Sequence, residues 1–270
     1  MKYALICIGG LVLAIGLSVL IVLLINRKKK LSILFKAIAI PLSSIVLSAC
    51  FLLTYFAFNY RASDTARSYL ESDSVVNFKN AQHWYEFDNI ENNENAIIFY
   101  SGGKVEDASY AQLCSEISHQ GIDVFLLKMP LYFPLLNIKG ADKVVNVKEY
   151  KNVYLMGHSL GGTTAALYLK DTKYSYKGII FLASYANKKL NDDYKCLSIY
   201  GSNDTVLNKK EYEKNKSNFP SGYKEVVIEG GIHSYFGDYG NQRGDGTPTI
   251  TRDEQITKTK EEVLSFITSE

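Results

Sequence analysis

Two long apolar segments open the chain. The first runs from Tyr3 to Ile25 without a charged residue, and the second runs from Ala37 to Phe58, interrupted by Pro41 and a few Ser and Thr residues. At a helical rise of about 1.5 Å per residue, each segment is long enough to cross the roughly 30 Å hydrocarbon core of a bilayer. The first is also longer than the apolar part of an ordinary secretory signal, which has about 7–15 residues. The pattern predicts a transmembrane helical hairpin over residues 1–58, with residues 3–58 as the part in contact with lipid, rather than a buried core helix.

A basic loop separates the two segments. It contains five positive charges, Arg27, Lys28, Lys29, Lys30 and Lys36, and no acidic residue. Positively charged loops stay on the cytoplasmic side of a membrane. Both ends of the hairpin then face outward. The expected location is therefore the cell membrane, with two spans and the large C-terminal part outside the cytoplasm.

Short β-rich runs and helix-like stretches alternate in the rest of the chain. The expected strands cover residues 96–100, 123–129, 153–156, 178–183, 196–200 and 225–229. The expected helices cover residues 107–119, 141–150, 161–170, 209–216 and 252–268. Such alternation predicts an α/β fold, a mostly parallel sheet with helices on both faces. Residues 59–95 are polar and mixed, which indicates a juxtamembrane stalk and a first strand near residues 84–87, and residues 96–270 are expected to form one domain.

The charges are unevenly distributed along the chain. Six of the 30 Lys and Arg residues lie in residues 1–58, so the remainder is mildly acidic although the whole chain has a formal net charge of +2. An acidic soluble part without a basic stripe argues against nucleic-acid binding. With 47% hydrophobic and 21% charged residues, the composition is that of a folded protein and excludes a disordered chain.

Four cysteines without regular spacing exclude a disulfide scaffold and a zinc ribbon. Cys114 and Cys196 fit buried core positions. Cys50 ends the tetrapeptide Leu47-Ser48-Ala49-Cys50, which is similar to a bacterial lipobox, where the cysteine is lipidated after cleavage. The apolar segment continues past Cys50, and another precedes it, so a chance resemblance is the better interpretation. Lipidation of Cys50 stays open.

A Gly-x-Ser-x-Gly motif follows the third expected strand. The sequence Gly157-His158-Ser159-Leu160-Gly161 lies between a strand and a helix. At such a junction the motif is typical of a nucleophile elbow, a turn so sharp that side chains on either side of the serine would clash. Ser159 is therefore the candidate nucleophile, held at a helix N-terminus where backbone N–H groups stabilise an oxyanion.

A serine needs a base to act as a nucleophile at neutral pH. The chain has four histidines, His83, His119, His158 and His233. Only His233 follows the last expected strand, the place of the base in the chain order Ser, Asp or Glu, His. His158 lies inside the elbow and is expected to pack beside the nucleophile.

The acid that orients His233 is expected between Ser159 and His233. The candidates are Asp171, Asp192, Asp193, Asp204, Glu211, Glu213, Glu225 and Glu229. Only Asp204 lies just past the carboxyl end of an expected strand, where parallel sheets carry their functional loops. Its expected role is to fix the tautomer of His233 and to stabilise the imidazolium.

An acyl-transfer site also needs two N–H donors for the oxyanion. The first is the backbone N–H of Leu160, which follows the nucleophile. The second is expected from the loop after the strand 96–100, where two glycines let the backbone approach a substrate carbonyl closely. Gly103 is the favoured donor, and Gly102 and Lys104 are the alternatives.

These residues resemble the α/β-hydrolase superfamily, and within it the small bacterial hydrolases with a dienelactone-hydrolase-like domain behind an N-terminal membrane anchor. The resemblance covers residues 95–270 and is carried by the blocks 99–106, 128–130, 157–162, 182–185, 198–204, 227–233 and 236–246. It implies the α/β-hydrolase fold and a Ser–His–Asp hydrolase without a cofactor, and it implies no particular substrate. The short stretch from Ala183 to Cys196 leaves no room for a large cap domain.

The leading interpretation is a membrane-anchored, esterase-like serine hydrolase that cleaves a small-molecule carboxylic ester or lactone. If an alcohol replaces water as the acceptor, the same site is an acyltransferase, and a non-catalytic surface binding module is the competing class. The loop 131–136 is either an apolar wall of the site or a partly buried loop. The Gly- and Asp-rich stretch 237–246 lacks the spacing of a calcium loop, so we expect it to pack near His233 and expect no metal site.

Overall fold

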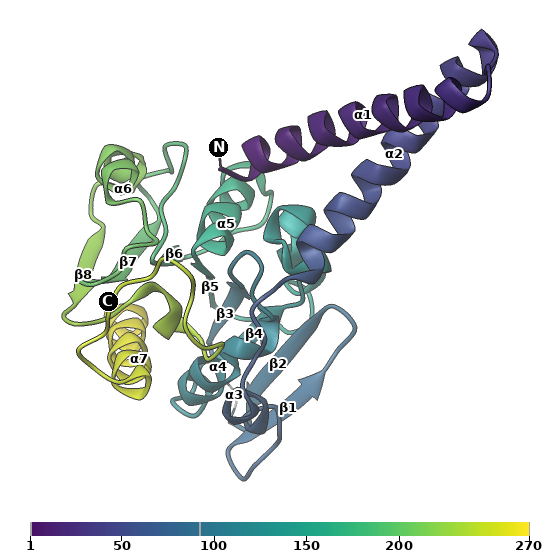
Figure 1. Cartoon of the computed structure of the whole chain (residues 1–270). Coiled ribbons are helices and arrows are strands. Elements are labelled where there is room, and N and C mark those ends of the chain that lie inside the picture. Colours follow the sequence, from purple (N-terminus) through teal and green to yellow (C-terminus); the bar gives the residue numbers. More distant parts are fainter. Residues whose placement is uncertain (1, 92, 270) are drawn as a thin grey trace. The chain divides into compact units, whose positions relative to one another are not determined.

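The chain separates into two compact units, residues 1–58 and 59–270, and the computed structural model describes residues 2–91 and 93–269 (Figure 1). The first unit is a hairpin of two helices, α1 (Lys2–Lys28) and α2 (Ile33–Ala57). The Ser32 hydroxyl accepts the N–H of Phe35 and caps the start of α2. Both helices are long and apolar enough to cross a membrane, by length and composition.

Two serine side chains of α2, Ser43 and Ser44, find hydrogen-bond partners within the helix itself. The hydroxyl of Ser43 donates to the carbonyl of Ala39 at 2.7 Å, and the hydroxyl of Ser44 donates to the carbonyl of Ile40, also at 2.7 Å. A hydroxyl without a partner would be costly in hydrocarbon. These bonds make α2 compatible with an apolar environment.

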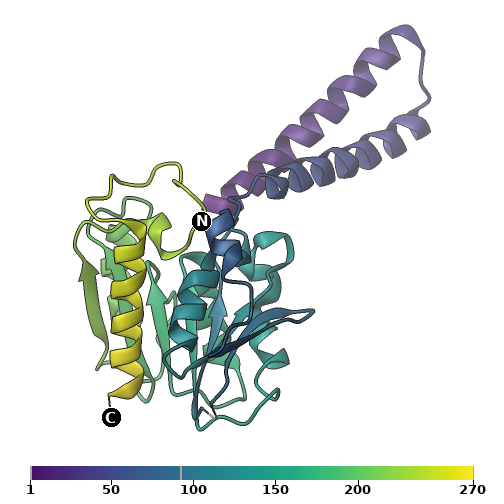
Figure 2. The ribbon, with the colours of Figure 1, turned by 90° about the horizontal axis from the view of Figure 1, so that it is seen from below.

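Within the described residues, the second unit contains one eight-stranded sheet in the order β1-β2-β4-β3-β5-β6-β7-β8 (Figures 1 and 2). The strands are β1 (Val76–Asn80), β2 (Trp84–Asn89), β3 (Asn95–Tyr100), β4 (Asp123–Leu127), β5 (Asn152–His158), β6 (Gly178–Leu182), β7 (Lys195–Gly201) and β8 (Lys224–Ile228). The strands β3 to β8 pair in parallel, whereas β2 pairs antiparallel with both β1 and β4. The mostly parallel sheet predicted from the sequence is confirmed.

Helices cover both faces of the sheet. They are α3 (Asp64–Ser68), α4 (Ala111–Ser118), α5 (Leu160–Asp171), α6 (Lys209–Asn215) and α7 (Arg252–Thr268). Short 3₁₀ turns cover Asp107–Tyr110, Pro130–Tyr132, Lys216–Asn218 and His233–Phe236, and a longer, kinked 3₁₀ segment covers Pro134–Lys143. Successive side chains of β3 point to opposite faces. Ile97 and Phe99 pack with α4 and α7, whereas Ile98 and Tyr100 pack with α5 and α6.

The prediction of an α-helix over residues 141–150 is wrong. The 3₁₀ turn Pro134–Lys143 ends there, and the chain continues irregularly to β5. Tyr150 and Lys148 hold this stretch, because both donate hydrogen bonds to the buried carboxylate of Asp123, at 2.6 and 2.9 Å. Val and Asn residues in the stretch also have low helix propensity, so the contacts with Asp123 determine the backbone conformation here.

The strand expected near residues 84–87 is confirmed by β2, whereas the part of residues 59–95 expected as a stalk also carries regular structure. Residues 59–95 contain α3, β1 and β2, and the unit that holds the sheet begins at Asn59. Phe87 of β2 is completely buried in the core, and Phe78 of β1 packs against it with ring centres 5.4 Å apart. The polar residues of β1, Asn77, Lys79 and Asn80, are exposed.

Candidate active site

Ser159 lies at the sharp turn between β5 and α5, just past the carboxyl end of β5. Its backbone has φ 52° and ψ −122°, a conformation that residues other than glycine rarely adopt and that costs about 1–3 kcal/mol. Neighbouring glycines permit the turn. A Cβ on Gly157 would lie 2.5 Å from the backbone of Gly162, and one on Gly161 would lie 2.2 Å from the carbonyl oxygen of Tyr100. The strand–turn–helix geometry expected at the motif is present.

Hydrogen bonds from the neighbouring strand hold this turn. The N–H of Ser159 donates to the carbonyl of Leu182 at 2.9 Å, and the hydroxyl of Ser184 donates to the Ser159 carbonyl at 2.6 Å. Both partners lie at the end of β6. The side chain of Ser159 is partly exposed at the start of α5, and its hydroxyl makes no hydrogen bond within residues 2–91 and 93–269.

Asp204 and His233 form a buried pair. Asp204 follows the end of β7 and His233 opens the 3₁₀ turn after β8, and the Asp204 Oδ2 atom lies 2.8 Å from His233 Nδ1. The other Asp204 oxygen accepts the N–H groups of Val206 and Leu207, each at 2.8 Å. With Nδ1 donating to the carboxylate, Nε2 of His233 is the nitrogen left to accept a proton.

Two side chains from later in the chain, Asp245 and Gln255, position the backbone around His233. The carboxylate of Asp245 accepts the N–H groups of His233 and Ser234 at 3.1 and 2.7 Å. The amide of Gln255, on α7, accepts the N–H of Ile232 at 2.9 Å and donates to the Ile232 carbonyl at 2.8 Å. The stretch 237–246 therefore packs near His233, as its sequence predicts.

The ring of His233 lies next to the elbow. Its centre is 4.6 Å from the ring centre of His158, the residue that directly precedes Ser159. Within the described part of the chain, His233 Nε2 is buried and has no hydrogen-bond partner. Catalytic hydrogen bonds are often long in unliganded enzymes and tighten when substrate binds. The structure thus joins Asp204 to His233 and puts His233 beside the turn that carries Ser159, without a Ser159–His233 hydrogen bond.

His158 links the elbow to the loop after β3. Its Nδ1 atom lies 2.8 Å from the hydroxyl of Tyr110, which accepts the N–H of Gly102 at 3.0 Å. Burial, and next the nearby His233, hold the pKa of His158 well below its usual range, so the ring is neutral. A neutral ring accepts the Tyr110 proton at Nδ1 and carries its own proton on Nε2. His158 packs beside the candidate nucleophile, as expected, and it also holds the glycine loop in place through Tyr110.

The three candidate donors in that glycine loop differ in their hydrogen bonds. The N–H of Gly102 donates to Tyr110, and the N–H of Lys104 donates to the carbonyl of Tyr132 at 2.6 Å. The N–H of Gly103, which is partly exposed, has no acceptor among the described residues. Leu160 supplies the first N–H of α5, which has no partner inside a helix. Of the candidate oxyanion donors, Gly103 and Leu160 thus have N–H groups without an acceptor among the described residues.

The buried carboxyl group of Asp107 is bonded to the same glycine loop through Ser101. The Ser101 hydroxyl donates to Asp107, and the other oxygen of Asp107 accepts the N–H of Met129 at 3.0 Å. Burial raises the pKa of Asp107 to about 7, against the opposing effect of these hydrogen bonds. Sequence reasoning missed Asp107, Tyr110 and Gln255, because nothing in the local sequence marks their contacts.

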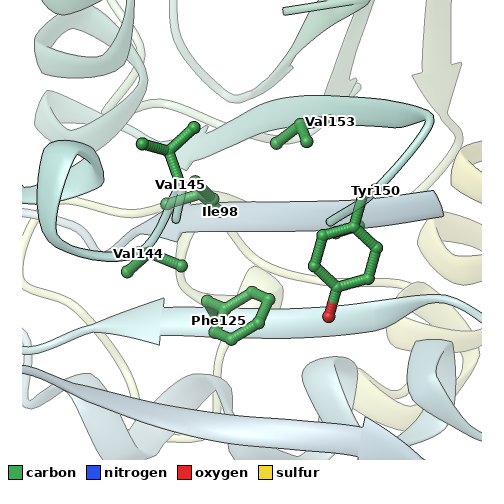
Figure 3. Close-up of a pocket in the computed structure, with 7 residues that line it drawn as sticks. Ile98, Phe125, Val144, Val145, Tyr150 and Val153 are labelled. Carbon is green, nitrogen blue, oxygen red and sulfur yellow. The ribbon is translucent and has the colours of Figure 1, made fainter. Parts of the chain in front are cut away.

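The residues of the remaining predictions are placed as follows. Cys114 and Cys196 are buried and free, as expected, and burial raises the pKa of both thiols. Within the described residues, no group of three or more His, Cys, Asp or Glu side chains is arranged to hold a metal ion. A small apolar pocket, lined by Ile98, Phe125 and Val153 among others, lies near the start of β5, whereas Ser159 follows its end (Figure 3). This pocket is separate from the candidate site.

Comparisons with known proteins agree with this architecture. A scan against protein-family models matches residues 96–257 to the model described as the alpha/beta hydrolase family. A search of curated proteins finds no match.

Three solved structures are similar to the chain at low sequence identity. Est1E from Butyrivibrio proteoclasticus has 15% identity and a TM-score of 0.51, over 73% of this chain and 100% of that one. A dienelactone hydrolase from Anabaena variabilis has 10% identity and a TM-score of 0.52, over 70% and 97%. The Francisella virulence factor BioJ has 12% identity and a TM-score of 0.54, over 75% and 89%. At these identities the similarity shows the fold, and it confirms the fold class expected from the sequence.

Proposed function

The chain belongs to the alpha/beta hydrolase family, and from this premise we propose that it is a membrane-anchored serine hydrolase that cleaves a carboxylic ester or a lactone. The observation that carries the proposal is the strained Ser159 turn beside the buried Asp204–His233 pair. The family supports hydrolase activity on small molecules. A dienelactone hydrolase among the structures of the same fold supports the choice of an ester-like bond.

In the proposed reaction, the Ser159 hydroxyl attacks the ester carbonyl while His233 Nε2 takes its proton. The N–H groups of Leu160 and Gly103 stabilise the oxyanion, and Asp204 stabilises the imidazolium. His233 then gives the proton to the leaving alcohol, which departs and leaves an acyl-enzyme on Ser159. Water, deprotonated by His233, attacks the acyl-enzyme and releases the acid. No metal or cofactor enters these steps.

The membrane anchor in this proposal is the α1–α2 hairpin. Both helices have the length and composition of a membrane span, and most of the apolar side chains described in α2 are exposed rather than packed in a core. The basic residues between them would lie on the cytoplasmic side. The hydrolase unit would then be extracytoplasmic.

The first test is hydrolysis of p-nitrophenyl esters with acyl chains of increasing length. We expect the detergent-solubilised full chain to hydrolyse part of the series, and Ser159→Ala to lower kcat/KM by roughly four or more orders of magnitude, because the nucleophile of a triad is lost. Ser217→Ala, which changes an exposed serine, is the matched control and should keep full activity.

The same assay separates the alternatives. Faster product release with added alcohol, and formation of a new ester, would make the protein an acyltransferase that uses the same residues. If the wild-type chain hydrolyses no ester and does not react with a fluorophosphonate probe, the hydrolase proposal fails and a non-catalytic binding module takes its place.

A further inference from the structure

The chain enters the hydrolase unit at the carboxyl edge of the sheet. We call its first five residues, 59–63, the junction segment. Tyr60 in this segment donates its N–H to the carbonyl of Lys104 at 2.8 Å, accepts the N–H of Glu106 at 2.9 Å, and so forms a parallel bridge with Val105. Lys104 directly follows the proposed oxyanion donor, Gly103. The junction segment is therefore a short strand alongside the oxyanion loop.

The junction segment also contacts the loop that follows His233. The N–H of Ser63 donates to the carbonyl of Asp238 at 3.0 Å, and the N–H of Arg243 donates to the hydroxyl of Tyr60 at 3.1 Å. The loop that carries Gly103 and the loop that follows His233 are thus both bonded to the residues at which the unit begins.

The chain leaves little distance between these loops and the apolar segment. Only Asn59 stands between Tyr60 and Phe58, the last residue of the predicted second span. Two residues of extended chain reach about 7 Å at most. If that segment crosses a bilayer, as proposed above, chain length alone keeps the backbone beside the oxyanion loop close to the membrane surface.

Exposed apolar side chains lie at the same edge of the sheet. Leu131 and Leu136, in the loops after β4, are 50% and 54% exposed. The carbonyl of Tyr132 accepts the N–H of Lys104, so this loop lies against the oxyanion loop. Arg61, also exposed, lies 5.7 Å from the Tyr132 ring centre and donates to its hydroxyl at 3.3 Å. Leucines beside a cation are the side chains that a surface facing anionic lipid presents.

We propose that the substrate is an ester carried by a membrane amphiphile, and that this edge of the hydrolase unit takes it from the bilayer surface. Leu131 and Leu136 contact the acyl region of the lipid, and Arg61 contacts its headgroups. The inference rests on the proposed function, since it names the substrate class of the same site.

The test compares two esters on the full chain reconstituted in vesicles of phosphatidylcholine and phosphatidylglycerol. One is p-nitrophenyl acetate in solution, and the other is p-nitrophenyl palmitate dissolved in the vesicles. A variant carries a Gly/Ser spacer of about 30 residues between Phe58 and Asn59, which adds roughly 30 Å of root-mean-square reach. We expect the spacer to lower the palmitate rate at least about fivefold and to leave the acetate rate unchanged.

A second variant does not alter the junction. Leu131→Ser/Leu136→Ser is expected to lower the ratio of palmitate to acetate rates severalfold, and Val227→Ser, which changes an exposed valine of β8, is expected to leave it unchanged. If the ratio of palmitate to acetate rates is unchanged in both the spacer and the leucine variants, the inference is overturned. Acetate hydrolysis that is lost in Ser159→Ala would still uphold the proposed function. Should the spacer abolish acetate hydrolysis through misfolding, the leucine variant decides. Activity on neither ester, or activity that survives Ser159→Ala, would refute the proposed function itself.

Discussion

Asp107 is a buried carboxyl group beside the proposed oxyanion loop rather than in contact with a reacting atom. It bonds the loop residue Ser101 on one side and the backbone of Met129 on the other. Because burial raises its pKa to about 7, the folded chain holds a proton there that the unfolded chain has already released above about pH 4. Stability is therefore lost as the pH rises from about 4 to 7, and the loss levels off above the folded pKa.

We expect Asp107→Asn to reduce this pH dependence. Between pH 5 and pH 8, the free energy of unfolding of the wild-type chain should fall by about 2–3 kcal/mol more than that of the variant. Thermal unfolding of the detergent-solubilised chains at several pH values measures the difference. Asp193→Asn, which changes an exposed carboxylate, should follow the wild-type curve. Parallel curves for all three proteins would show that Asp107 is ionised throughout.

At the scale of single residues, the sequence predicts the candidate catalytic groups from residue type and chain order. Ser159 stands in a motif, and His233 and Asp204 each follow a strand in the expected order. Tyr110 and Asp107 cannot be found in this way. Their partners, His158 and Met129, are 48 and 22 residues away, and only the folded sheet brings these pairs together.

The packing of α5 against the end of β3 leaves no room for a side chain at Gly161. A Cβ on Gly161 would lie 2.2 and 2.3 Å from the carbonyl oxygens of Tyr100 and Ser101, which are backbone atoms and cannot turn aside. We expect Gly161→Ala to destabilise the chain by about 2–4 kcal/mol and to cut ester hydrolysis strongly, because α5 and the oxyanion loop must separate. Chemical denaturation and the ester assay measure the two effects.

Gly222 provides the matched control for this prediction. It lies in an exposed turn before β8, and a Cβ there would meet nothing within 4 Å. Gly222→Ala is expected to change the stability by less than about 0.5 kcal/mol. Equal stability of the two alanine variants would contradict the packing argument.

Periodicity predicts most elements of the hydrolase unit but not those decided by tertiary contacts. The strands β3 to β8 and the helices α5, α6 and α7 lie within a few residues of their expected bounds. The stretch 141–150 is wrongly predicted as a helix, because hydrogen bonds from Lys148 and Tyr150 to Asp123 hold its backbone in a non-helical conformation. β1 is not apparent from sequence, because a short edge strand with polar residues on one face has the composition of a loop.

At the scale of the whole molecule, the proposed location depends on the topology of the hairpin. We expect a reporter that is active only outside the cytoplasm, fused after Glu270, to be active in intact cells, because the basic loop between the spans is retained inside. Replacing Arg27, Lys28, Lys29 and Lys30 by Gln should reduce this activity. A cytoplasmic reporter that is active at the same fusion point would exclude the proposed orientation.

The contact between Gln255 and Ile232 has a consequence for the order in which the protein is made. The backbone beside His233 is held by α7, which lies in the last nineteen residues of the sequence shown. A ribosome releases α7 after the strands β1 to β8 have been synthesised. In a nascent chain, the backbone beside His233 therefore lacks these two hydrogen bonds until α7 has left the ribosome.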